Sequence, residues 1–164
     1  MLRPTSMRHL TAQEYCAHLA PLLRAQTDEN FTSLAMMRDP IDWLRSWYRF
    51  YLRDALDDYA LTLRTRGFEA FVRDYIDQHD SLAPISAQHK FLCDPSGSPL
   101  VDRIFRYEMI DDFVRYLEDR LDCIVTLPRL NVPPAVDVAL SSATEQDLRA
   151  AMHEDFDLYA GLAS

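Results

Sequence analysis

The first hydrophobic pattern along the chain has helical spacing. Thr11 followed three residues later by Glu14 is the capping-box pattern that marks the start of a helix. Apolar residues then recur every three or four positions, at Tyr15, Leu19, Leu22 and Leu23. This spacing predicts a helix over residues 11–25.

A short uncharged run follows and ends abruptly. Residues 31–37, Phe-Thr-Ser-Leu-Ala-Met-Met, have the length and composition of a buried strand. Asp39 and Pro40 come almost directly after it, and these residue types favour the N-cap and the first position of a helix. The apolar stripe of that helix consists of Ile41, Leu44, Tyr48, Tyr51, Leu52, Ala55 and Tyr59. We therefore expect a buried strand that runs straight into a capped helix.

Helical patterns return in three later segments. Gly67 interrupts the first pattern, so a second short amphipathic helix is expected over residues 68–76. Another helix is predicted over residues 109–121, with these positions facing inward: Ile110, Phe113, Val114, Leu117 and Leu121. Thr144 followed by Asp147 indicates the cap of a last helix.

The segments between these helices carry turn signals. Residues 80–99 have the composition of a loop, and Asp-Pro-Ser-Gly at 94–97 is a strong turn signal. The apolar runs on either side, 90–93 and 100–105, favour a small hairpin. Residues 127–134 form a proline-rich irregular loop.

Length and charge limit the functions to consider. The 164 residues suffice for one domain, so residues 1–164 are expected to form a single unit. Asp and Glu number 26 against 17 Lys and Arg, and the net charge of -9 disfavours nucleic-acid binding because it repels a phosphate backbone. Lys90 is the only lysine, so chemistry that needs a lysine ammonium has a single candidate.

Cysteine usage and hydropathy bear on location. Cys16, Cys93 and Cys123 form no CxxC pair and lie near no histidine at zinc-finger spacing, which disfavours a disulfide scaffold and a structural zinc. No apolar run has the length of a signal-peptide core or approaches the roughly 20 residues of a membrane span. We therefore expect a soluble cytoplasmic protein that enters no membrane.

The step from residues 31–37 into the next helix is the most informative stretch. It is expected to present free backbone N–H groups and the positive end of the helix at the carboxyl edge of the strand, where an anion binds. Arg38 lies at that edge, and Ser46 lies about two turns into the helix. The alternative is structural, with Arg38 paired to Asp39, Asp42 or another nearby acid.

The complete pattern AMMRDPIDWLRSWY resembles the 3′-phosphate-binding motif of the sulfotransferase family, in which a buried strand leads into an Arg-Asp-Pro turn and a Ser-x-Tyr helix. The resemblance implies that Arg38 and Ser46 contact the 3′-phosphate of 3′-phosphoadenosine 5′-phosphosulfate (PAPS). It also implies an α/β fold, a small parallel sheet wrapped by helices, similar to the P-loop kinase-like architecture of sulfotransferases. The family's chemistry demands no metal.

Later segments are similar to the family in the same order. Residues 88–94, followed by Ile-Phe-Arg-Tyr-Glu at 104–108, look like its Q-x-x-F-L … G … R-[FY]-E segment. Residues 128–131 look like its proline–asparagine loop, and residues 148–159 look like its last helix, with Asp-Phe near the end. The family's first signature, a strand, a Pro-Lys-x-Gly-Thr loop and a helix around the 5′-phosphosulfate, has no counterpart, and Lys90 lies in a different region. The resemblance therefore implies an N-terminally truncated fold with little or no turnover.

Sulfuryl transfer also needs a group that removes a proton from the acceptor. His9 is the candidate base, because Arg-His-Leu-Thr at 8–11 is similar to the Lys/Arg-His-x-Thr segment of several family members. The alternative is a structural or exposed histidine. His89 is a second candidate, in a loop expected to line the acceptor cleft. The unit Arg-Tyr-Glu at 106–108 is interpreted as structural, an Arg–Glu pair with a buried tyrosine.

Three functions stay open on these grounds. The preferred one is a sulfotransferase whose true start lies upstream of residue 1, which transfers a sulfuryl group from PAPS to a hydroxyl or amine of a small-molecule or carbohydrate acceptor by in-line displacement. This chain by itself is expected to be impaired in this transfer. The second is a degenerate, non-catalytic relative that binds adenosine 3′-phosphates or a protein partner. The third is a mostly helical interaction module. In the first two, a homo-oligomer that covers the open sheet edge is the expected assembly.

Overall fold

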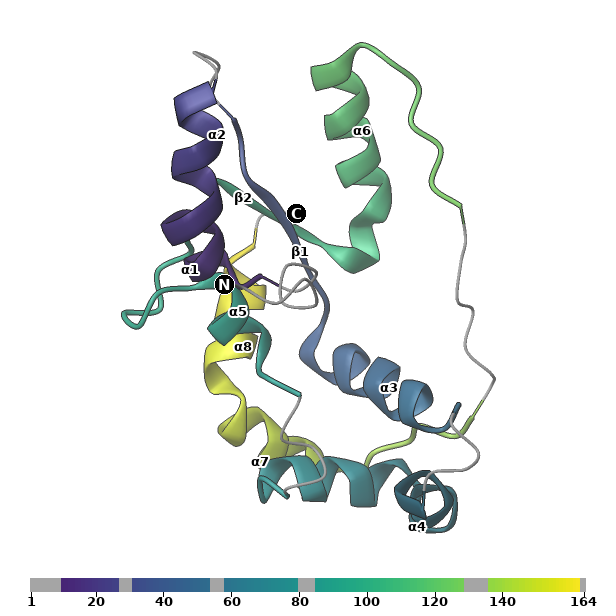
Figure 1. The fold of residues 1–164 in the computed structure, drawn as a ribbon. Helices are drawn as coiled ribbons and strands as arrows, with labels where there is room; N and C mark the ends of the chain where they lie inside the picture. The colour runs from purple at the N-terminus through teal and green to yellow at the C-terminus, as the bar shows by residue number, and fades with distance from the viewer. Residues whose placement is uncertain (1–9, 27–30, 54–57, 80–84, 129–135, 163–164) are drawn as a thin grey trace.

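The computed structural model describes the chain in five stretches: residues 10–26, 31–53, 58–79, 85–128 and 136–162. Within them the fold mixes helix and sheet, is mostly helical and contains one parallel sheet of two strands (Figure 1). The expectation of a small parallel sheet with helices around it is confirmed at this coarse level. No helix in these stretches is both long and apolar enough to cross a bilayer.

The two strands come from distant parts of the chain. β1 (Leu34–Met37) pairs in parallel, residue for residue, with β2 (Arg103–Arg106). The strand predicted over residues 31–37 is therefore in the right place but too long. Asp102 limits it, because its Oδ2 accepts hydrogen bonds from the backbone N–H and the hydroxyl of Ser33 at 2.7 and 2.6 Å.

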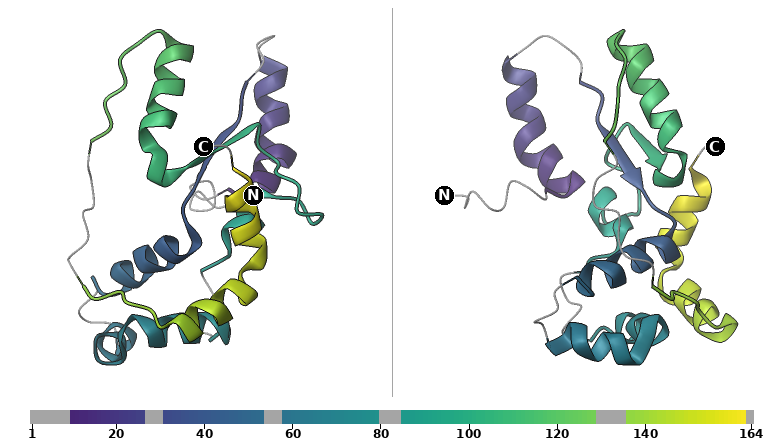
Figure 2. Two further views of the ribbon diagram at one scale, coloured as in Figure 1. Left: turned by 180° about the vertical axis from the view of Figure 1, so that it is seen from behind. Right: turned by 90° about the vertical axis from the view of Figure 1, so that its right-hand side faces the viewer.

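Helices flank the strand pair on two sides. The helix predicted over residues 11–25 is confirmed as three consecutive parts, α1 (Ala12–Glu14), a π-helical stretch η2 (Tyr15–Leu19) and α2 (Ala20–Gln26). Its capping box is formed, with Glu14 N donating to Thr11 Oγ1 at 3.2 Å and Thr11 N donating to Glu14 Oε2 at 2.8 Å. Figures 1 and 2 show the strands between this segment and α6 (Ile110–Leu121).

The largest apolar core is formed by four helices at the bottom of Figure 1: α3 (Pro40–Tyr51), α4 (Asp58–Ile76), α7 (Ser142–Ala151) and α8 (His153–Gly161). Its buried residues are Ile41, Leu44, Tyr48, Leu52, Leu63, Phe68, Phe71, Val72, Ile85, Leu148 and Met152. Each buried Leu or Phe contributes about 1.5–3 kcal/mol, so this core holds α3, α4 and α7 together, and α8 adds the partly buried Phe156. Of the predicted stripe, Ile41 to Leu52 lie on α3 and its C-cap, whereas Ala55 lies outside the described residues. Gly67 breaks α4 as predicted, with φ 81°.

A short helix occupies most of the first strand of the predicted hairpin. α5 (Gln88–Leu92) lies where a loop and a first hairpin strand are expected, and residues 103–106 pair with β1 instead. The turn is present, since Gly97 has φ 84° and one antiparallel bridge joins Cys93 to Pro99 beside it. Asp94 N donates to Ser98 O and Leu100 N donates to Leu92 O, both at 2.9 Å, so a small hairpin is confirmed over residues 92–100 but not over the longer strands predicted.

The C-terminal helices differ from the prediction in two details. α6 is confirmed, preceded by a 3₁₀ turn, η4 (Tyr107–Met109), but Leu121 is 61% exposed rather than inward. The cap of α7 is Ser141, whose Oγ accepts from Thr144 N at 3.3 Å. Thr144 is itself fully buried, so its predicted role as the cap is wrong.

Candidate functional site

An arginine and a tyrosine stack at the carboxyl edge of the sheet. Arg38 follows β1 and Tyr107 follows β2, and parallel strands bring both to the same edge. The Arg38 guanidinium carbon lies 3.9 Å from the centre of the Tyr107 ring, a cation–π contact. Within the described stretches the guanidinium forms no hydrogen bond and no ion pair, and Asp42 instead pairs with Arg45 at 2.7 Å. Arg38 thus keeps an unneutralised charge at this edge.

The start of α3 is closed by its own cap. Asp39 Oδ1 accepts hydrogen bonds from the N–H groups of Ile41 and Asp42 at 2.9 and 3.0 Å, and Pro40 has no N–H. Asp39 and Pro40 therefore act as the N-cap and first helical residue, as predicted. The prediction of free backbone N–H groups for an anion is wrong, because the cap uses them. An anion at this edge depends on side-chain donors, above all Arg38.

Two remote side chains hold the backbone of the Arg38-Asp39 turn. Gln88 Oε1 accepts from Arg38 N at 3.0 Å, and Gln88 Nε2 donates to Arg38 O at 2.9 Å. Glu108 Oε1 accepts from Asp39 N at 3.0 Å, while its Oε2 accepts from the Tyr159 hydroxyl at 2.8 Å. The turn therefore joins α5, the end of β2 and α8.

The charges around Glu108 differ from the predicted Arg–Glu pair. Arg106 does not contact Glu108, since its Nη2 donates to the carbonyl oxygens of Tyr159 and Leu162 at 3.2 and 3.0 Å. Arg106 thus binds the end of α8, where a cation stabilises the helix. Burial, together with the hydrogen bond to the Glu108 carboxylate, raises the pKa of Tyr159 to about 12. The Tyr159 hydroxyl therefore remains a donor at neutral pH.

A fully buried acid organises the start of α5. Asp155 has 0% exposure, and its Oδ2 and Oδ1 accept from the backbone N–H groups of Gln88 and His89 at 3.1 and 2.7 Å. The His89 ring lies between two carboxylates, with Nδ1 2.7 Å from Asp155 Oδ1 and Nε2 3.0 Å from Glu154 Oε2. Both ring nitrogens are thus occupied in this arrangement, which leaves no free nitrogen to act as the second candidate base.

The remaining predicted site residues are placed only in part. Ser46 is half-buried on α3, seven positions after Asp39. Seven residues at 100° each return to the same helix face, so Ser46 lies on the Asp39 face, roughly 10 Å further along the axis. In the described part of the chain no direct contact joins Ser46 to Arg38, so a ligand that touches both would bridge them. His9 and residues 129–131 lie outside the described residues.

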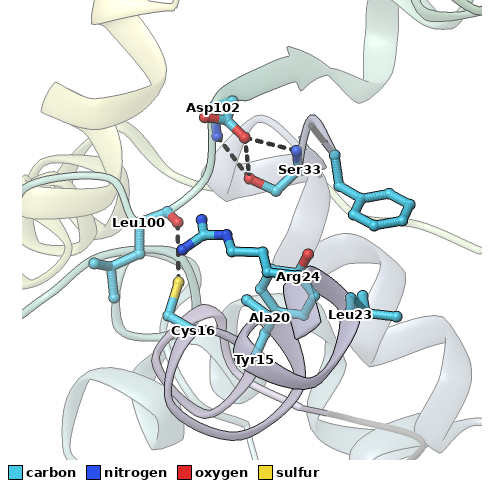
Figure 3. Close-up of a pocket in the computed structure, with 9 residues that line it drawn as sticks. Tyr15, Cys16, Ala20, Leu23, Arg24, Ser33, Leu100 and Asp102 are labelled. Carbon is cyan, nitrogen blue, oxygen red and sulfur yellow. Dashed lines mark hydrogen bonds between the residues drawn. The ribbon is translucent and has the colours of Figure 1, made fainter. Parts of the chain in front are cut away.

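Two hollows of the surface lie elsewhere. The first, of about 80 Å³, lies at the amino ends of the strands beside Ser33 and Asp102 (Figure 3). Cys16 Sγ lies 3.4 Å from Leu100 O there, and hydrogen bonds from Ser33 lower the pKa of Asp102. The second, an uncharged groove of about 330 Å³, is lined mainly by Leu10, Ala12, Tyr15, Leu34, Ala35, Phe91, Leu92 and Val101. Neither of these two hollows includes Arg38.

Sequence reasoning assigned no role to Gln88 or Asp155. A signal for Asp155 exists, because it lies seven positions after Leu148 and three after Met152, on the apolar stripe of the last helices. An acid at such a position must find donors in the interior. No comparable signal marks Gln88, since its partner is Arg38, far away in sequence.

No family model matches this chain, and neither a curated protein nor a solved structure shows significant similarity to it. Among the described residues, no three His, Cys, Asp or Glu side chains group in a way that would hold a metal ion.

Proposed function

We propose that this chain is a sulfotransferase-like protein with a P-loop kinase-like α/β fold, and that its Arg38 edge binds the 3′-phosphate of PAPS. One observation carries the proposal: segments that resemble the family separately in sequence meet at one turn. Gln88, Glu108 and Tyr159 come from three such segments: Gln88 and Glu108 hydrogen-bond to the Arg38-Asp39 turn, and Tyr159 hydrogen-bonds to Glu108.

The chemistry of the edge suits a phosphate. Arg38 offers a planar, permanently charged fork with donors that match phosphate oxygens. Its guanidinium rests on Tyr107, which is 47% exposed, so the stack is open to a ligand from solvent. Ser46 would add a neutral hydroxyl donor. Ligands of open α/β sheets bind at the carboxyl ends of the strands, which is where Arg38 lies.

The proposed reaction is in-line transfer of the sulfuryl group from PAPS to a hydroxyl or amine of a small-molecule or carbohydrate acceptor. The acceptor oxygen or nitrogen bonds to sulfur and gives its proton to the base, while the bond from sulfur to the 5′-phosphate oxygen breaks and adenosine 3′,5′-bisphosphate leaves. His9 remains the proposed base. Among the described residues, Arg38 and Ser46 would bind the nucleotide through its 3′-phosphate. A non-catalytic relative that binds adenosine 3′-phosphates would bind the 3′-phosphate through the same residues.

Calorimetric titration with adenosine 3′,5′-bisphosphate tests the proposal. We expect saturable binding that weakens at least about tenfold in Arg38→Ala, because a hydrogen bond to a charged group is worth about 1.5–3 kcal/mol. Arg115→Ala is the matched control, since Arg115 is a highly exposed arginine on α6 whose ion pair is with Asp112. Equal affinities of wild type and Arg38→Ala, or no binding by wild type, would refute the proposed site.

A further inference from the structure

We infer that Gln88 is a positioning residue for Arg38 and that Asp155 holds Gln88 in place. The inference rests on the proposed function, because it concerns how Arg38 is aimed at a 3′-phosphate. Gln88 touches the backbone of Arg38 and not its guanidinium, so it acts on a ligand only through Arg38.

The hydrogen-bond ladder shows why Arg38 needs such a partner. In a parallel pair, alternate residues of one strand turn their backbone groups toward the neighbour. Arg103 N donates to Ser33 O, so Ser33, and by alternation Ala35 and Met37, face β2. The backbone N–H and carbonyl of Arg38 therefore face the opposite edge, where the described residues include no further strand.

The Gln88 amide replaces a strand at this one position. A primary amide carries the same donor and acceptor as a peptide group. Gln88 uses both, accepting from Arg38 N and donating to Arg38 O, at 3.0 and 2.9 Å. Two bonds to one residue fix the orientation of its backbone, and with it the direction in which the side chain leaves the sheet.

Asp155 in turn fixes Gln88. Its fully buried carboxylate accepts from the N–H groups of the first two residues of α5, Gln88 and His89. A carboxylate is costly to bury unless donors surround it, so the bonds that relieve this cost also tie α5 to α8. Asp155, Gln88 and Arg38 thus form one chain of contacts from α8 to the edge of β1.

The test measures discrimination between adenosine 3′,5′-bisphosphate and adenosine 5′-monophosphate, which differ in the 3′-phosphate. Gln88→Met keeps the length of the side chain and removes both hydrogen bonds. In this variant we expect the ratio of the affinity for the bisphosphate to that for the monophosphate to be about tenfold lower than in wild type. We also expect Arg38→Ala and the double variant to show the same preference as each other, because Gln88 acts through Arg38. Gln146→Met, at an exposed position of α7, is the control and is expected to leave the preference unchanged.

Thermal melts show whether Gln88→Met is folded. If it is not, Gln88→Glu takes its place with Gln146→Glu as the charge-matched control, since glutamate keeps the acceptor and loses the donor to Arg38 O. A folded Gln88 variant that retains the full preference overturns the inference alone. A wild type that binds both nucleotides equally overturns the proposed function, and the inference with it.

Discussion

Two carboxylates at the proposed phosphate site, those of Asp39 and Glu108, are held in place by hydrogen-bond donors. Asp39 accepts two N–H groups of α3, and Glu108 uses one oxygen for Asp39 N and the other for Tyr159. Arg38 rests on a neutral ring and keeps its charge available. The partner of each residue therefore decides which charge the edge presents to a ligand.

The hydroxyl of Tyr159 is expected to stabilise the fold in a pH-dependent way. At pH 8, Tyr159→Phe should lower the free energy of unfolding by about 1 kcal/mol, because Glu108 loses a donor. The pKa of Tyr159 is raised to about 12 in the folded protein, against roughly 10 for an unfolded chain. The contribution of the neutral phenol is thus complete below roughly pH 10 and lost as the pH rises to about 12.

Urea unfolding of wild type and Tyr159→Phe at several pH values measures this difference. The difference between the two proteins should shrink across that pH range, since a phenolate would face the Glu108 carboxylate. Other tyrosines, such as Tyr75 whose pKa burial also raises, affect both proteins alike. A difference that stays constant with pH would contradict the assigned hydrogen bond.

At the scale of helices and strands, local patterns were predictable and contacts across the chain were not. The capping box of Thr11, the Asp39-Pro40 start of α3 and the break at Gly67 all depend on neighbouring residues, and all three are confirmed. The short helix α5 was missed, because Asp155, far along the chain, supplies its N-terminal acceptor. The hairpin is shorter than predicted, because residues 103–106 pair in parallel with β1.

The same division holds for the candidate site. Arg38 was predictable because its position after a strand is visible in the local pattern. The Arg38 guanidinium stacks on a ring instead of pairing with an acid because of the position of Tyr107. The backbone contacts of the turn depend on Gln88 and Glu108. Such contacts are set by the packing of α5, β2 and α8, which no local spacing encodes.

The bend in α4 provides a test at this scale. Gly67 has φ 81° and ψ 178°, a conformation that other residues adopt only at a cost of about 1–3 kcal/mol. A Cβ at Gly67 would meet nothing within 4 Å, so Gly67→Ala should destabilise through backbone strain alone, by that amount. Gly161→Ala is the control, because Gly161 also has open space and no positive φ. If thermal denaturation finds both variants equally stable, the bend at Gly67 is not as described.

The molecule as a whole carries a net negative charge, and the residues of its proposed site come from distant parts of the sequence. The net charge of -9 repels anions in general, so attraction at Arg38 has to be local. The contacts of the turn come from α5 and from Glu108 after β2, and α8 reaches the turn through the bond of Tyr159 to Glu108. A ligand that binds there is therefore coupled to the packing of α5 and α8. The hollow beside Cys16 lies at the amino ends of the strands, and its lining residues take part in none of these contacts.

The most direct test follows the arginine Nε–H signals by ¹H–¹⁵N NMR during titration with adenosine 3′,5′-bisphosphate. Arg38→Ala identifies the Arg38 signal by its absence. The account predicts a saturable shift of that signal with the bisphosphate and a much smaller one with adenosine 5′-monophosphate. An Arg38 signal that does not move while the bisphosphate binds, or a shift of the same size with both nucleotides, would contradict the assignment of this edge to a 3′-phosphate.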